Sequence, residues 1–200
     1  MSPRGLTKGR KPLFAARTND ERDAGPGSRH AAWLAALRIY FVVIIAGNLL
    51  WEAFHMPLYT VWREEEMSTI VVYGLHCTAG DILIALATLI GPLLVLGHPA
   101  WPERGFRGVA ASAIALGVGY TAFSEWWNVE VQQSWAYTEA MPTIGATGIG
   151  LSPILQWLVV PGIAFWLVRR LRRTGDRSAV PTAGTRSADG YRQERSAESG

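Results

Sequence analysis

The chain has 200 residues, of which 49% are hydrophobic and 18% are charged, and its formal net charge is +3. The apolar residues are concentrated in the middle, with almost no aliphatic runs near either terminus, which excludes both a uniform soluble globule and a fully disordered chain. A single cysteine excludes an intramolecular disulfide framework and a cysteine-based structural zinc site.

The two ends of the chain differ in composition from the middle. Residues 1–30 are basic and rich in Gly, Pro, Arg and Ser, and residues 169–200 have a similar composition. Neither segment can bury enough apolar surface to offset the entropy lost on ordering. The sequence therefore predicts disordered tails at 1–30 and 169–200, on either side of a transmembrane domain at 31–168.

Four stretches within this domain are long enough to cross a bilayer, which takes about 20 mostly apolar residues per helix. They lie near residues 31–51, 70–96, 106–126 and 149–168. Four such stretches leave too little polar surface to cover them in water. We therefore expect an all-α, polytopic membrane protein whose four helices form a bundle.

The third stretch carries small residues at spacings of three and four, and small residues let membrane helices approach closely. They are Gly108, Ala111, Ala115 and Gly119. This stripe predicts that the third helix packs at the centre of the bundle through that face.

A long connection at 127–148 follows the third stretch and contains no Lys or Arg. Its large aromatic residues and its Gly and Pro residues indicate an ordered segment, and long loops in compact folds are usually either functional or disordered. We expect residues 127–148 to form either a lid over the mouth of the bundle or an interfacial segment that anchors the loop.

Basic residues are distributed unevenly about the four stretches. Of the 19 lysines and arginines, only Arg63 falls in the two loops predicted to share one side; the same loops hold five glutamates. By the positive-inside rule, both termini are cytoplasmic and the acidic loops face outward across the inner or plasma membrane. The net charge then reflects topology and attraction to membrane lipids, and it predicts no nucleic-acid partner.

Five ionisable residues fall at a common depth in the outer half of the predicted membrane domain. Helix geometry places Glu52 and His55 at the outer end of the first helix, His76 and Asp81 in the second, and Glu125 near the end of the third. Ionisable groups within a membrane are costly and by default face a bundle interior or a wet cavity. This layer is the candidate functional site.

The spacing within the layer favours a metal site. Glu52 and His55 share a helix face, and a Glu-x-x-His pair is a metal-ligand arrangement in helical bundles. His76 and Asp81 lie about 140° apart around their helix, which weakens convergence. We predict Zn, Mn or Fe bound by Glu52, His55, His76, Asp81 and Glu125. Residues predicted to support these ligands or line the pocket are Tyr59, Tyr73, Tyr120, Ser124, Trp135 and Tyr137.

Three alternatives remain for the same residues. The first is a metal-free pocket for a lipid or small amphiphilic ligand that enters from the outer leaflet. The second is a haem or quinone site in which His55 and His76 are ligands. The third is an internally paired polar network that holds the helices of an accessory subunit together. No nucleophile motif selects a reaction, so the sequence leaves open whether the protein is an enzyme.

The predicted topology can be tested with alkaline phosphatase fusions, because this enzyme needs the oxidising side of the membrane to form its disulfides. Fusions after Glu65 or Ser134 should be active, and fusions after Arg104 or Arg173 should be inactive. The reverse pattern would overturn the orientation.

Overall fold

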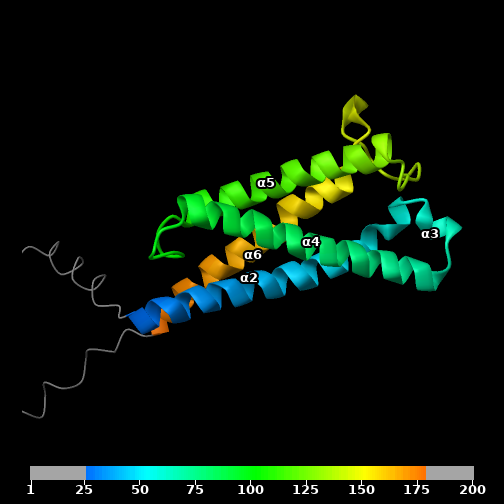
Figure 1. Cartoon of the computed structure of the whole chain (residues 1–200). Coiled ribbons are helices and arrows are strands. Elements are labelled where there is room, and N and C mark those ends of the chain that lie inside the picture. The colour runs from blue at the N-terminus through cyan, green and yellow to red at the C-terminus, as the bar shows by residue number, and fades with distance from the viewer. Residues whose placement is uncertain (1–25, 179–200) are drawn as a thin grey trace, which may run out of the picture.

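The computed structural model of the chain describes residues 26–178, and residues 1–25 and 179–200 of the predicted tails lie outside the described residues. The long helices are α2 (Pro26–His55), α4 (Met67–Leu96), α5 (Phe106–Trp126) and α6 (Leu151–Ser178), as Figure 1 shows. The short ones are η1 (Met56–Leu58), α3 (Val61–Glu64), the π-helical η2 (Trp127–Val131) and η3 (Gly145–Thr147).

The prediction of an all-α chain with four membrane-length helices is confirmed for the described residues. All four long helices contain segments long and apolar enough to span a membrane. The described part of the chain forms no β-strand, although two isolated β-bridges occur beside the helices.

The helix bounds differ from the predicted ones mainly at the two ends of the described chain. α2 starts at Pro26, and α6 continues to Ser178, so the helical region extends into both predicted tails. Arg and Leu are good helix formers, which favours continuation of α6 beyond Val168. Arg172 also ties this extension to the rest of the fold, since its Nη1 donates to the carbonyl oxygen of Ala32 at 2.8 Å.

The four long helices pack side by side, with α2 against α4 and α6, and α5 against the same two helices. Figure 1 shows both described ends of the chain and the α4–α5 connection at one end of the bundle. We call this the basic end, because Arg104, Arg107, Arg169 and Arg172 lie there. The opposite end, which carries α3 and the lid (residues 127–148), is the lid end.

The apolar core lies between all four long helices, with most of its residues on α2 and α6, and includes one residue from the α4–α5 connection. Tyr40 and Phe165 pack against each other with ring centroids 4.9 Å apart. Trp101 is only 1% exposed and packs edge-on against Trp33. The ring of Trp101 therefore closes the core at the basic end of the bundle.

The predicted packing face of α5 is wrong. The predicted stripe, Gly108, Ala111, Ala115 and Gly119, is exposed. The face that packs repeats every four residues and comprises Val109, Ala113, Gly117, Thr121 and Glu125. Gly117 accounts for the difference, because a Cβ atom there would overlap the indole ring of Trp157, whereas Gly119 has open space around it. The large ring on α6 selects which small-residue face of α5 turns inward.

These two glycines supply a matched test of the packing. Gly117→Ala should destabilise the protein by about 1–3 kcal/mol, because the added methyl group overpacks the contact with Trp157. Gly119→Ala should leave stability unchanged or slightly raise it, because alanine favours a helix and nothing lies within reach. Unfolding of both variants in detergent would measure the difference. Equal effects would contradict the assigned packing face.

Candidate functional site

A cavity of about 410 Å³ opens at the lid end between the long helices and the lid. All five residues of the predicted ionisable layer contribute to its wall: Glu52, His55, His76, Asp81 and Glu125. Five of the six predicted supporting residues also line it, namely Tyr59, Tyr73, Tyr120, Ser124 and Trp135. The structure thus brings residues from α2, α4, α5 and the lid to one chamber.

On α2 the polar residues form one buried stripe. Asn48, Glu52 and His55 follow one another at spacings of four and three, which keeps them on one helix face. All three are buried, and Glu52 is only 5% exposed. Glu52 and His55 pair with each other at 3.0 Å, and the remaining polar groups of the stripe need partners on the helices it faces, α6 and α4.

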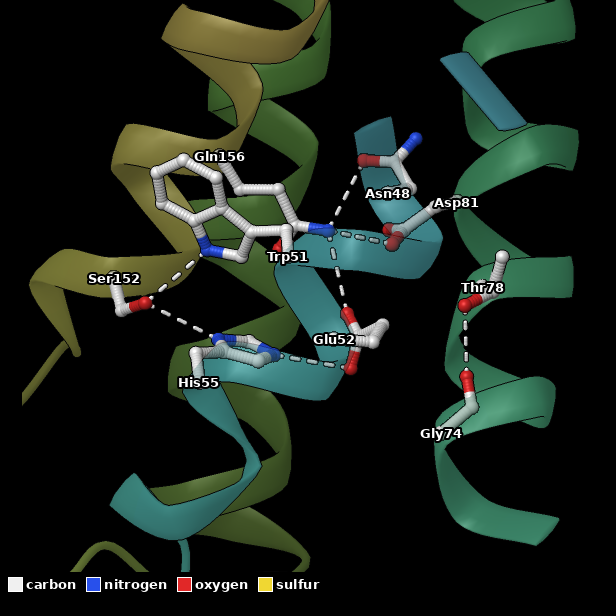
Figure 2. Close-up of polar contacts among 9 residues, drawn as sticks. All are labelled: Asn48, Trp51, Glu52, His55, Gly74, Thr78, Asp81, Ser152 and Gln156. Carbon is white, nitrogen blue, oxygen red and sulfur yellow. Dashed lines mark hydrogen bonds and ion pairs between the residues drawn. The ribbon is translucent and has the colours of Figure 1, made fainter. Parts of the chain in front are cut away.

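Gln156 on α6 meets this need at the point where three helices converge (Figure 2). Its side-chain Nε2 lies 3.0 Å from Asn48 Oδ1, 3.3 Å from Glu52 Oε1 and 2.9 Å from Asp81 Oδ2. An amide nitrogen has two hydrogens, whereas three oxygens approach this one. One acceptor therefore has room for a further donor, supplied by a proton on a carboxyl group, by water or by a ligand.

His55 extends the network towards the lid end. Its Nε2 lies 3.0 Å from Glu52 Oε2, and its Nδ1 lies 3.2 Å from the hydroxyl of Ser152. The indole N–H of Trp51 donates to the same hydroxyl at 3.2 Å, which leaves the Ser152 hydrogen free to point at His55. This pattern satisfies a neutral imidazole that donates from Nε2 to Glu52, and Figure 2 shows the continuous chain of contacts.

Glu125 forms a second polar centre, on the α5 side of the cavity. The Tyr137 hydroxyl donates to Glu125 Oε2 and accepts from the backbone N–H of Gly150 at 3.1 Å. Burial, followed by the contact with Glu125, raises the pKa of Tyr137 above its ordinary value. The phenol therefore keeps its proton into alkaline pH and remains a donor to the carboxylate. Tyr137 does not line the cavity, but its hydrogen bond holds the carboxylate of Glu125 in position.

The lid is attached to the bundle by backbone hydrogen bonds. Thr60 N–H donates to the carbonyl of Ala136 at 3.0 Å, and Thr138 N–H donates to that of Leu58 at 2.8 Å. Tyr59, between these bonds, packs its ring against His55 and Tyr137, with centroids 5.3 and 5.5 Å away. Burial and the neighbouring Glu125 raise the pKa of Tyr59. The lid is thus an ordered wall of the site.

The expected metal ligands share the cavity without forming a coordination group. Among the described residues, no cluster of three or more His, Cys, Asp or Glu side chains is placed to hold a metal ion. Glu52 and His55 are directed at each other and at Gln156 and Ser152, while His76 is an exposed residue on the cavity wall. The predicted Zn, Mn or Fe site therefore gains no support from the geometry.

Sequence reasoning missed the uncharged members of the network. Asn48 lies four residues before Glu52, and Gln156 is the one amide in the apolar stretch of α6, so both were visible as polar residues in membrane-length segments. The predicted site consists mainly of ionisable side chains, although an amide in lipid also needs a partner. Ser152 gave no comparable signal, because serine is common in membrane helices.

The wall of the cavity is acidic and aromatic. None of the described residues that line it is lysine or arginine, whereas five are carboxylates, namely Glu52, Glu64, Glu65, Asp81 and Glu125. The buried indole N–H of Trp135 has no regular hydrogen bond, although Glu125 lies nearby. Among the described residues of the wall, carboxyl groups therefore outnumber basic groups, and the histidines are the only basic side chains.

Removal of the Tyr137 hydroxyl tests how the lid is held. Tyr137→Phe removes the donor to Glu125 and the acceptor for Gly150. The free energy that holds the lid against the bundle should therefore fall by about 1–3 kcal/mol. Amide hydrogen exchange at Gly150 and in the lid should accelerate about tenfold or more. Tyr120→Phe is the control, since Tyr120 lines the cavity but is half-exposed. Equal exchange in both variants would show that the Tyr137 contacts do not hold the lid.

No protein-family model, curated protein or solved structure matches this chain. The functional argument therefore rests on the cavity itself: its charge, its shape and the donors and acceptors in its wall.

Proposed function

We propose that the protein is an integral membrane protein that binds a small amphiphile with a positively charged head group in the cavity at the lid end. The cavity opens to the outer side of the inner or plasma membrane, and both termini are cytoplasmic. The observation that carries the proposal is that the described residues of the cavity wall include five carboxylates and no lysine or arginine.

Charge supports a cationic ligand. Carboxylates in a partly dehydrated site repel one another, and a bound cation relieves that repulsion. The Gln156 amide nitrogen has two hydrogens for three nearby oxygens, so one oxygen is left to attract the positive charge of a ligand head group. An anionic ligand would find acceptors where it needs donors.

Aromatic side chains support the same assignment. Tyr59, Tyr73, Tyr120, Trp135 and Trp157 all contribute to the wall. The faces of aromatic rings attract ammonium groups by about 0.5–2 kcal/mol each, and quaternary ammonium groups are typical ligands of aromatic cages. Carboxylates and rings together favour an alkylated amine over a bare inorganic cation.

Size and surroundings support an amphiphile. A cavity of about 410 Å³ lies within the range of small-molecule sites, roughly 300–1,000 Å³. Apolar residues such as Met56, Ile84 and Pro153 contribute to its wall beside the polar ones. An alkyl chain can follow these surfaces towards the lipid while the head group stays among the carboxylates.

The proposal predicts selective binding of dodecyltrimethylammonium over its uncharged isostere, in which carbon replaces the nitrogen. Tryptophan fluorescence of protein in lipid nanodiscs reports binding, because Trp135 and Trp157 line the cavity. Asp81→Asn and Glu52→Gln should each weaken binding of the cation about tenfold or more, as removal of a charged partner typically does. Glu139→Gln is the control, since this exposed lid residue does not line the cavity.

Two results would overturn the proposal. Equal affinity for the cation and the isostere would show that charge recognition is absent. The second result is stoichiometric Zn, Mn or Fe in the purified protein that is lost in Glu52→Gln and Asp81→Asn but retained in Glu139→Gln. It would show that the site binds a metal instead. Affinity for the isostere should stay unchanged in all three variants, which separates lost recognition from lost folding.

A further inference from the structure

A second cavity, of about 560 Å³, lies at the basic end, far along the bundle from the acidic one. It is formed by the end of the α4–α5 connection, the first turn of α5 and residues 168–172 of α6. Its charged wall residues are Arg107, Arg169, Arg172 and Glu103, and Phe106 contributes apolar surface. Three positive charges against one negative make this chamber the electrostatic opposite of the first.

The arginines of this cavity are not equally engaged. Arg172 donates to the Ala32 carbonyl and forms an ion pair with Glu103, so it is fixed to α2 and to the α4–α5 connection. Arg107 and Arg169 make no hydrogen bond or ion pair with the side chains that the structure describes. Two guanidinium groups from two helices therefore line the cavity with their donors available.

The start of α5 adds further donors to the same wall. Its N-cap is Gly105, whose φ of 72° lies in the left-handed region and which has no side chain to cap the helix. The first backbone N–H groups of a helix have no intrahelical acceptor and carry partial positive charge. Phe106, Arg107 and Gly108 form this first turn and line the cavity.

We propose that this cavity binds the phosphate of an anionic membrane phospholipid. Guanidinium forks and helix N-termini both match phosphate oxygens, and basic pockets between membrane helices on the cytoplasmic side hold anionic head groups. The site lies where the membrane-length helices end, at the level of the head groups. Phe106, which is partly exposed, offers apolar contact for the start of the acyl chains.

Glu103 opposes the binding of an anion in this cavity. Its carboxylate occupies Arg172 and places a negative charge in a wall that would otherwise be wholly basic. Removal of that charge should strengthen anion binding, because it releases a guanidinium group and ends a repulsion. A gain of affinity of this kind cannot arise from damage to the fold.

The test measures retention of dioleoyl phosphatidylglycerol against dioleoyl phosphatidylcholine by native mass spectrometry of the full chain. Arg107→Gln and Arg169→Gln should each weaken phosphatidylglycerol binding about fivefold, as expected for one basic residue at a head group. Glu103→Gln should strengthen it several-fold. Arg170→Gln is the control, because Arg170 is next to Arg169 but lies over the Trp166 ring and does not line the cavity.

The outcomes separate the possible sources of phosphate. Equal retention of the two lipids, or equal losses in Arg169→Gln and Arg170→Gln, would overturn the proposal. If glycerol phosphate, which has no acyl chains, binds as tightly as the lipid with the same response to the variants, the lipid assignment is overturned in favour of a soluble phosphate ester. Selective retention of phosphatidylglycerol, lost in Arg107→Gln and Arg169→Gln, supports the lipid site.

Discussion

The side-chain amide of Gln156 is the contact on which the rest of the arrangement depends. From α6 it reaches Asn48 and Glu52 on α2 and Asp81 on α4, and Gln156 itself is only 2% exposed. In a low-dielectric interior a polar group without a partner is costly, so these residues have to lie at the same height. One amide thereby sets the relative depth of three helices.

Several features of the lid end follow from that constraint. Once Glu52 is fixed, His55 meets Ser152 on α6, and the ring of Tyr59 packs on His55. Tyr59 in turn lies between the backbone hydrogen bonds that hold the lid. The acidic cavity therefore follows from the hydrogen bonds that join α2, α4 and α6. Tyr137 completes it by bonding both to Glu125 and to Gly150, the residue directly before α6.

The sequence was sufficient for the helices and for the depth of the polar layer. The predicted ends of α4 at Leu96 and of α5 at Phe106 agree with the structure, because glycine, proline and charged residues interrupt the apolar runs there. The predicted end of α5 at Trp126 also agrees, and the chain continues from there as the π-helical η2. The rise per residue of a helix is enough to predict that Glu52, Asp81 and Glu125 lie at one depth in the membrane. In the structure all three line one cavity, and their function there stays a prediction.

Rotation of each helix about its axis could not be predicted in the same way. α5 carries small residues on two faces, and only the position of Trp157 on another helix decides that Gly117 faces inward and Gly119 outward. The Glu-x-x-His pair suggested a metal, but Glu52 and His55 bond to each other. Their remaining partners are Gln156 and Ser152, more than 90 residues away in the chain. Such pairings depend on tertiary contacts that local spacing does not encode.

A double-mutant cycle between Gln156→Leu and Asp81→Leu tests the central claim most directly. If the amide ties α6 to α4, the two substitutions should be coupled by about 0.5–1.5 kcal/mol in the free energy of unfolding, the range found for hydrogen bonds between membrane helices. Gln156→Leu combined with Thr88→Val should show no coupling, because the Thr88 hydroxyl bonds within its own helix at 2.8 Å. Strict additivity in both pairs would contradict the account.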